Sequence, residues 1–405
     1  MAILILNGYS HEHMPYEKWL KDSSEDLVLI TCRKHMNEFP AGRYVEVIGF
    51  NNYELNSNVE LTAIELNKKY NFTRIISTYE FDLVRAARLR EALNIPGQQY
   101  DSAIYFRDKL LMKQLAKQNH LKVPLFTKLD SSITLLEFIN LHGYPVVVKP
   151  RDGAGAEGVK ILKNEGDLKA FLNEGIPRNY MVEEFIDGQM FHIDVLTFKG
   201  DIIFNWPSTY LVSNLDFNDG GYAGSHLIEE GHVFFKKLID YATQLINSFP
   251  SPSHGAFHIE VFVNKEEEVI LCEVASRAGG GKIVEQIYHA FDINLCEVSV
   301  RSQSNLYSKQ EATMIRTSPK KITGSLLIPP LNKHINRLPS VNPPENVLEY
   351  LTYINLDEQK KKADSLIDRI ATFVVEAKGD MSIQDSMNTA YKWFINNLEI
   401  YEKQS

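Results

Sequence analysis

The stretch around residues 258–282 constrains the fold of this chain more than any other. Two apolar, β-branched runs, at 256–263 and 269–274, flank a polar turn at 264–268. Runs of this length on either side of a polar turn are typical of a β-hairpin. Each arm also carries one acidic residue, and a carboxylate in a half-buried strand is costly unless it is paired or holds a metal. The hairpin is therefore expected to build a site.

The acidic residues of the hairpin, Glu260 and Glu273, predict a cation site. Adjacent arms can bring both carboxylates to one end of the same sheet face, and Mg²⁺ prefers a few such oxygens together with substrate phosphates. Arg277 could clamp a phosphoryl group, and the glycines at 279–281 let backbone N–H groups approach an anion before a helix begins near Ile283. The alternative is a solvent-exposed hairpin with scattered charges, but the order of these features favours the ligand site.

The composition is that of an ordinary globular protein with a sizeable core. Of the 405 residues, 44% are hydrophobic and 23% are charged, and the length allows roughly two to four domains. The net charge of −9 argues against a nucleic-acid partner and against an anionic membrane surface. The three cysteines are far apart, which argues against a disulfide framework or a zinc site and fits the cytoplasm. No run approaches the roughly 18 apolar residues of a membrane span, and the short apolar run at 2–6 is expected to be a first strand and not a signal peptide.

Residues 1–95 alternate between short apolar runs and helical patterns. Strands are expected at 3–6, 27–31, 44–48 and 75–77, and helices at 59–70 and 81–93. This alternation predicts a small parallel sheet that helices cover on both faces. The loop at 7–10 follows the first strand, where such sheets bind ligands, although a plain turn is the favoured interpretation.

A glycine-rich loop follows the strand that ends at Lys149. The loop at 153–158 matches G-x-G-x-x-G, but a strand-like run at 159–162 follows it where a dinucleotide-binding loop would require a helix. It also fails as a Walker A loop, because Val159 stands where that loop has lysine. We expect a glycine hairpin between two antiparallel strands, which closes over phosphates through its backbone N–H groups. A long surface hairpin is the alternative, and the nearby Lys149 favours phosphate.

Two further stretches suit a nucleotide. An apolar strand meets two acids and a turn at 180–188, and backbone groups at such a hinge can hold adenine while an acid takes its exocyclic amine. Lys109 begins a helix after Asp108, where it could reach a phosphate, although taken alone it is more readily interpreted as a solvated lysine. The glycine-rich loop at 218–224 could move over a substrate. In the tail, strands at 322–328 and 370–375 and a closing helix at 382–397 are expected.

Together these features resemble the ATP-grasp superfamily of carboxylate–amine ligases. The features that carry the resemblance, in chain order, are Lys109, Lys149, the glycine hairpin 153–158, the hinge 183–186, Glu260, Glu273 and Arg277. The resemblance covers roughly residues 1–310. Within the superfamily, the chain most resembles the bacterial L-amino acid ligases, which join two free amino acids into a dipeptide.

The resemblance implies a fold and a domain organisation. The fold would be α/β, or α+β overall, with an ATP-grasp architecture. An N-terminal parallel α/β domain would span 1–107 and the ATP-grasp region 108–311, with a lid subdomain at about 123–188. A C-terminal subdomain would span 312–405. Dimers are a sound default for the oligomeric state, so a homodimer is expected.

The resemblance also implies roles for individual residues. Those that would bind ATP are Lys109, Lys149, Gly153, Gly155, Gly158, Glu183, Glu184, Phe185 and Ile186. The lysines would contact phosphates and the glycines would belong to the lid loop. At the hinge, Glu183 and the backbone of Phe185 would hold adenine. Glu260 and Glu273 would bind one or two Mg²⁺ ions, with Mn²⁺ as an alternative. Arg277 and Lys149 would be catalytic, with Arg277 stabilising the transferring phosphoryl group or the tetrahedral intermediate.

Two positions depart from the pattern of the superfamily. Many members have a glutamate after the hinge that accepts the ribose hydroxyls, where this chain has Met190. Many also have an asparagine two residues after the second metal-binding acid, where this chain has Ala275. The ribose contacts and the number of metal ions are therefore open.

The implied activity is the ATP-dependent joining of two L-amino acids through an acyl phosphate. The sequence does not say which amino acids are used or in which order. The alternatives are a ligase for another carboxylate such as D-alanine, a carboxylase that uses bicarbonate, and a non-catalytic ATP-binding regulator. Because the acids and Arg277 are all present, an enzyme is favoured over a regulator.

Overall fold

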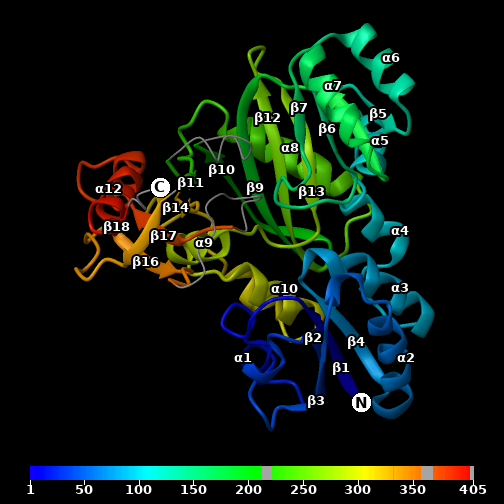
Figure 1. Ribbon diagram of the computed structural model, residues 1–405. Coiled ribbons are helices and arrows are strands. Elements are labelled where there is room, and N and C mark those ends of the chain that lie inside the picture. The colour runs from blue at the N-terminus through cyan, green and yellow to red at the C-terminus, as the bar shows by residue number, and fades with distance from the viewer. Residues whose placement is uncertain (212–220, 332, 357–367, 402–405) are drawn as a thin grey trace.

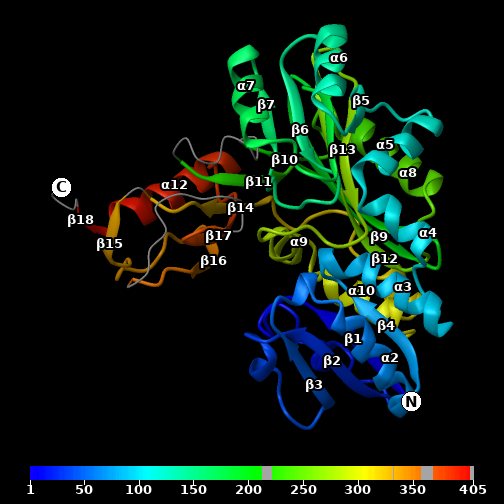
Figure 2. The same ribbon diagram turned by 45° about the vertical axis from the view of Figure 1, so that its right-hand side comes forward.

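Separate sheets organise the chain into regions (Figure 1). The structure, a computed structural model, describes residues 1–211, 221–331, 333–356 and 368–401. The N-terminal sheet lies at one end, a long central sheet runs through the middle, and a third sheet with its helices caps the opposite end. In both views the C-terminal region projects from the side of the central sheet (Figure 2).

The helices and strands follow the chain in the order of their numbers. The helices are α1 (Tyr16–Trp19), α2 (Asn58–Tyr70), α3 (Leu83–Leu93), α4 (Tyr100–Ala103), α5 (Lys109–Gln118), α6 (Ser132–His142), α7 (Glu165–Glu174), α8 (Phe235–Ser248), α9 (Ile283–Phe291), α10 (Leu295–Gln303), α11 (Lys309–Thr313) and α12 (Ile383–Asn396), with short 3₁₀ helices at Met36–Glu38, Tyr53–Leu55, Glu80–Asp82 and Ile104–Phe106. The strands are β1 (Ala2–Asn7), β2 (Asp26–Cys32), β3 (Tyr44–Phe50), β4 (Phe72–Ser77), β5 (Phe126–Leu129), β6 (Val146–Pro150), β7 (Lys160–Leu162), β8 (Tyr180–Glu184), β9 (Gly188–Phe198), β10 (Asp201–Tyr210), β11 (Ala223–Leu227), β12 (Gly255–Asn264), β13 (Val269–Ala275), β14 (Thr323–Ile328), β15 (His334–Arg337), β16 (Val347–Thr352), β17 (Ala371–Glu376) and β18 (Glu399–Tyr401).

The N-terminal sheet is parallel, with strand order β3-β2-β1-β4. Side chains along β1 alternate between two apolar clusters. Ile3 and Ile5 pack with residues of α1 and α10, whereas Leu4 and Leu6 pack with residues of α2 and α3. A parallel sheet with helices on both faces needs apolar residues on both sides of each strand, and the expected arrangement is confirmed.

The central sheet is antiparallel throughout, with strand order β13-β12-β9-β10-β11-β14-β17-β16. At its β12-β13 end, one face packs against α5 and α8 through buried residues such as Ile259, Val261 and Val274. The other face carries the acids of the hairpin. The expected hairpin at 256–274 is therefore the edge of this long sheet.

The expected lid subdomain contains a smaller antiparallel sheet with strand order β5-β8-β6-β7. Its core joins residues of α6 and α7 to those of the strands, among them Leu135, Phe171 and Val148. β6 and β7 pair antiparallel across the loop at 151–159. The glycine hairpin expected from the sequence is present.

The C-terminal region continues the central sheet. β14, β17 and β16 extend it beyond β11, and α12 packs on them through Met387, Ala390 and Phe394. β15 and β18 form a separate pair. Of the loop expected at 218–224, residues 218–220 lie outside the described residues and 223–224 belong to β11. None of the helices in the described ranges is long and apolar enough to cross a membrane.

Candidate active site

Cross-strand pairing aligns the two predicted metal ligands on one face of the central sheet. Glu260 of β12 lies directly opposite Glu273 of β13, and His192 of β9 lies opposite Glu260 on its other side. Directly opposed residues point to the same face, with Cβ atoms about 4.5–5.5 Å apart. The strands therefore hold the two carboxylates side by side.

Glu260 is held by groups from neighbouring strands. Tyr210 donates a hydrogen bond to its Oε1 over 2.7 Å, and His258 Nε2 lies 3.5 Å from the same oxygen. On its far side, His258 Nδ1 lies 2.9 Å from Asp194 Oδ1. Burial lowers the pKa of His258, but the Asp194 carboxylate outweighs burial and raises this pKa to about 9. A protonated His258 therefore places a positive charge beside Glu260 at neutral pH.

Glu273 faces cations. Its Oε2 lies 2.8 Å from Lys109 Nζ, and its side chain is 25% exposed. Burial raises the pKa of Glu273, but Lys109, Lys149 and Arg277 together lower it to about 2. The carboxylate is therefore ionised at neutral pH.

The paired carboxylates fit a hard divalent cation. Mg²⁺ is bound in proteins by one or two carboxylates, with phosphates and water completing the set, and Glu260 and Glu273 supply that number from two rigid strands. Ala275, two residues further along β13, offers no side-chain oxygen. The residues present thus suit a metal that also takes phosphate oxygens.

A second group of candidate ligands is a hydrogen-bonded row. His192, Asp194 and His258 bring ligand atoms within 4.8 Å of one another. Asp194, however, accepts from His192 Nδ1 over 2.8 Å and from His258 Nδ1 over 2.9 Å. Burial raises the pKa of Asp194, but the two rings outweigh it and lower the pKa well below its usual range. An ionised carboxylate between two ring donors explains the group without a metal.

Lys149 lies where the lid meets the central sheet. It is 4% exposed, and its Nζ lies 2.5 Å from Oε1 of the equally buried Glu183. Burial lowers the pKa of Lys149, but the Glu183 carboxylate reverses this and raises the pKa. Burial likewise raises the pKa of Glu183, and Lys113 and Lys149 lower it below its ordinary value. Both groups stay ionised, so the Lys149 ammonium group is a buried positive charge at the base of the lid.

Both Gly155 and Gly158, in the glycine loop of the lid, have positive φ angles, which glycine adopts without steric strain. Gly155 and Gly158 have φ values of +62° and +72°, and Ala156 between them has +61°. Lys109 Nζ donates to the Gly153 carbonyl over 2.8 Å, which ties α5 to the loop. The loop therefore starts beside the cations that face Glu273.

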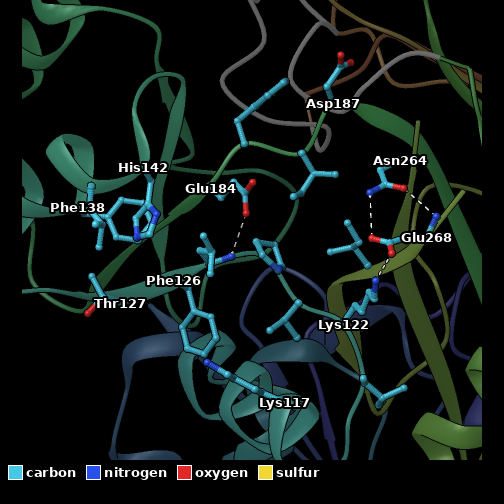
Figure 3. Close-up of a pocket in the computed structure, with 18 of the residues that line it drawn as sticks. Lys117, Lys122, Phe126, Thr127, Phe138, His142, Glu184, Asp187, Asn264 and Glu268 are labelled. Carbon is cyan, nitrogen blue, oxygen red and sulfur yellow. Dashed lines mark hydrogen bonds and ion pairs between the residues drawn. The ribbon is translucent and has the colours of Figure 1, made fainter. Parts of the chain in front are cut away.

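The hinge joins the lid to the central sheet. The Glu184 N–H donates to the Leu125 carbonyl over 2.8 Å, and its carboxylate accepts from the Leu125 N–H. Phe185 and Ile186 line a groove of about 970 Å³. Figure 3 shows Glu184 in this groove between the α6 side and the β12-β13 turn. Met190 lies in β9 and offers no side-chain oxygen to accept from a ribose, as the sequence indicates.

Arg277 reaches across to the N-terminal region. Its Nε forms an ion pair with Glu80, which also pairs with Arg107 just before α5. Burial raises the pKa of Glu80, but Arg277 and Arg107 outweigh it and lower the pKa. An acid from the N-terminal region thus stands between two guanidinium groups at the site.

Three residues that the sequence did not indicate also lie at the site: Glu80, Tyr210 and Lys113. Glu80 follows β4 at the carboxyl edge of the parallel sheet, which is a position where functional groups gather. Lys113 lies one helical turn after Lys109 on α5, so the spacing alone places both on one face. Tyr210 had no such signal, because its contact with Glu260 spans 50 residues.

Comparison with known families identifies the central part of the chain. A profile of the ATP-grasp domain matches residues 142–286. These residues form an ATP-grasp domain. The match includes the glycine loop, the hinge and the hairpin with both acids, so the expected resemblance is confirmed where the site lies.

Two relatives show similarity over longer stretches. An L-arginine-specific L-amino acid ligase of Bacillus subtilis is 28% identical over 245 residues, which is 58% of this chain and 59% of the relative. The chain thus spans less than two thirds of that relative's length. An N5-carboxyaminoimidazole ribonucleotide synthase of Staphylococcus aureus is 24% identical over 312 residues, which is 73% of this chain and 74% of the relative.

Solved structures share the fold over the whole chain. The L-amino acid ligase from Bacillus licheniformis has a TM-score of 0.78 and 17% identity, and the match covers 100% of this chain and 99% of that one. A phosphoribosylglycinamide synthetase from Anaerococcus prevotii has a TM-score of 0.69 and 18% identity, with 99% and 100% covered. The expected fold class is confirmed by these structures, and the ATP-grasp resemblance is confirmed over residues 142–286. The roles of single residues, the domain boundaries, the homodimer and the cytoplasmic location stay predictions.

Proposed function

We propose that this chain is an ATP-dependent ligase that joins the carboxylate of one L-amino acid to the amine of another. The observation that carries the proposal is the meeting of two opposed acids, Glu260 and Glu273, with Lys109, Lys149 and Arg277. Phosphoryl transfer needs little covalent chemistry from a protein and depends on positioning and charge stabilisation. This set of residues supplies both.

Similarity to ligases of amino acids supports the substrate class. One relative is named as an L-arginine-specific L-amino acid ligase, and a structure with the same fold is an L-amino acid ligase. We place the amino acid beside Arg277 at the carboxyl edge of the N-terminal sheet, because sheets of this kind bind ligands at that edge. The choice among amino acids would depend on single side chains at that edge.

The residues present fit ATP with Mg²⁺ as cofactors. Lys149 and Lys109 are placed to bind phosphates, and each now pairs with a carboxylate that a phosphate group would compete with. Glu260 and Glu273 would hold the metal. Bound Mg²⁺ would spread the negative charge of the phosphoryl group in transfer.

The reaction would proceed in two balanced steps. A carboxylate oxygen of the first amino acid forms a bond to the γ-phosphorus of ATP while the bond to the bridging oxygen of ADP breaks. The neutral amine of the second amino acid then attacks the acyl carbon, the bond from carbon to the phosphate oxygen breaks, and a proton is released. Arg277 and Lys149 stabilise the charge that develops in both steps.

The lid protects the intermediate. An acyl phosphate reacts with water, so the glycine loop must exclude solvent until the amine attacks. Gly155 and Gly158 provide the backbone freedom for that closure. No covalent nucleophile on the protein is needed.

A carboxylase is the second candidate, and one observation favours it. The similarity to N5-carboxyaminoimidazole ribonucleotide synthases extends over more of this chain than the similarity to the arginine-specific ligase. A member of that kind would activate bicarbonate in place of an amino acid carboxylate. The same cations and acids would serve both reactions.

The proposal is tested by measuring phosphate release from ATP and Mg²⁺ with each pair of L-amino acids, with mass spectrometry of the products. We expect a product equal in mass to the two amino acids minus water, formed together with ADP. Phosphate release that needs bicarbonate and yields no condensed product would favour the carboxylase. Binding of ATP without turnover in any mixture would favour a regulator.

A further inference from the structure

The strand that carries Glu273 contains one extra residue. β12 and β13 pair in regular register from His258 opposite Ala275 to Glu260 opposite Glu273, and the register then shifts so that Val261 lies opposite Leu271. Cys272 is the residue without a partner. This is a β-bulge, a feature that often lies next to active sites and re-aims a side chain.

The bulge decides which way Glu273 points. Val269, Leu271 and Val274 all belong to the apolar cluster beneath the sheet. Side chains alternate along a strand, so regular pairing of the same residues would turn Glu273 into that cluster after Leu271. The extra residue shifts the alternation by one and turns Glu273 to the opposite face, toward Glu260.

Lys113 binds the backbone of this bulge. Its Nζ donates to the Leu271 carbonyl over 2.9 Å and to the Cys272 carbonyl over 2.8 Å. The same ammonium lies 3.3 Å from Glu183 Oε2, on the strand of the lid that enters the hinge. Lys113 is fully buried. The Lys113 side chain thus connects α5 to both the bulge and the lid.

Burial of the Lys113 ammonium group is unfavourable for folding unless its contacts compensate for the lost hydration. Burial lowers the pKa of Lys113, because removal of an ion from water is unfavourable. At a core position without a further role, leucine or methionine would be buried at a lower free-energy cost than lysine. Here the ammonium donates to two carbonyls and lies 3.3 Å from a carboxylate at a point where the strand is irregular.

We propose that Lys113 is a positioning residue for the metal site, which acts through the bulge that aims Glu273. The inference rests on the proposed function in so far as Glu273 binds the metal. Lys113 does not touch substrate. Its neighbour Lys109, one turn earlier, contacts the Glu273 carboxylate, so α5 orients both the backbone and the side chain of this acid.

The test is the Mg²⁺ concentration that half-saturates the binding of mant-ADP, a fluorescent ADP, to the purified chain. Residues that orient metal ligands typically contribute tenfold to a hundredfold to metal affinity, so we expect Lys113→Met to raise this concentration at least about tenfold. Lys236→Met is the control, because Lys236 lies on α8, which packs on the same face of the central sheet, and it is exposed and does not line the groove at the hinge. It should leave the concentration unchanged.

The contact with Glu183 needs a separate comparison. In a Glu183→Gln background, Lys113→Met leaves no unpaired carboxylate at that position, so this double variant also serves if the single variant fails to fold. We expect the same rise in the Mg²⁺ requirement relative to Glu183→Gln alone. A lowered melting temperature with an unchanged Mg²⁺ requirement in both backgrounds would make Lys113 a stabilising residue only and would overturn the proposal. Absence of Mg²⁺-dependent mant-ADP binding in the unmodified chain would instead contradict the proposed function.

Discussion

Arg277, which follows β13, forms an ion pair with Glu80, which follows the last strand of the N-terminal sheet. Their side chains are 14% and 9% exposed. The pair connects the carboxyl edge of the parallel sheet, where such folds bind ligands, to the cations of the ATP-grasp domain. We infer that an amino acid bound at this edge would lie beside the arginine that we expect to stabilise its activation.

Replacement of Glu80 should destabilise the protein. Glu80→Gln leaves Arg277 and Arg107 without their shared carboxylate, and the loss of one partner from a buried ion pair costs about 3–5 kcal/mol. Urea unfolding measures this directly. The exposed Glu65→Gln is the control, since surface substitutions usually change stability by no more than about 0.5 kcal/mol.

The pH dependence of that loss has a defined sign. The folded-state pKa of Glu80 is lowered from the ordinary value of 4.5, so its contribution is fully present above about pH 4.5 and is lost as the pH falls through the folded-state pKa. The difference in unfolding free energy between the unmodified chain and Glu80→Gln should therefore be constant near neutral pH and shrink in acid. A difference that grows as the pH falls would contradict the assigned ion pairs.

Glu273→Gln should largely abolish ATP-dependent turnover and leave the fold intact. The variant removes one of two opposed carboxylates and the charge that Lys109 faces. Phosphate release and circular dichroism measure the two effects. Glu267→Gln, in the exposed turn of the same hairpin and outside the groove at the hinge, should behave like the unmodified chain. Near-normal turnover of Glu273→Gln would remove the basis for the metal assignment, as would full activity in excess EDTA.

Lys149→Met should weaken nucleotide binding. The substitution keeps most of the side-chain volume but removes the charge, and it leaves Glu183 with Lys113 as its remaining cation. Charge-assisted hydrogen bonds contribute about 1.5–3 kcal/mol, so we expect the Kd for mant-ADP to rise at least about tenfold. The exposed Lys163→Met, also in the lid, is the control. An unchanged Kd would exclude Lys149 from the nucleotide site.

Alanine substitutions at Gly158 and Gly143 distinguish an effect on stability from an effect on the function of the lid loop. Gly158 and Gly143 have φ values of +72° and +78°, and a Cβ at Gly158 would lie 2.5 Å from Tyr180 Oη, whereas a Cβ at Gly143 would meet nothing within 4 Å. Gly143→Ala should cost about 1–2 kcal/mol of stability from its backbone conformation alone, and Gly158→Ala should cost at least as much, because its Cβ also displaces Tyr180. Only Gly158→Ala should also raise the KM for ATP, because only Gly158 lies in the lid loop. Equal KM values for the two variants would contradict a role of this loop over the phosphates.

Local patterns in the sequence predicted the elements that build the site. The hairpin arms at 256–263 and 269–274 correspond to β12 and β13, and the helix expected at Ile283 begins there. Period-two alternation and turn residues act over a few positions, so they are visible in a single sequence. The bulge at Cys272 was not visible, because it depends on which residue of the partner strand lies opposite.

Contacts between distant residues could not be predicted. Glu80 and Arg277 are 197 residues apart, and Lys113 and Cys272 are 159 apart. Neither pair has a local pattern, because the sheet order and the packing of α5 bring them together. For the same reason, the sequence indicated strands in the tail but not that β14, β17 and β16 would continue the central sheet.

The most direct test of the proposed reaction follows an oxygen atom. If an amino acid carboxylate attacks the γ-phosphorus of ATP, one of its oxygens must leave with inorganic phosphate when the amide forms. The measurement uses an amino acid pair that supports turnover, with ¹⁸O in the carboxylate of the first amino acid, and mass spectrometry of the phosphate. The account predicts one ¹⁸O transferred to phosphate for each dipeptide formed. Phosphate without ¹⁸O, formed alongside dipeptide, would contradict an acyl phosphate.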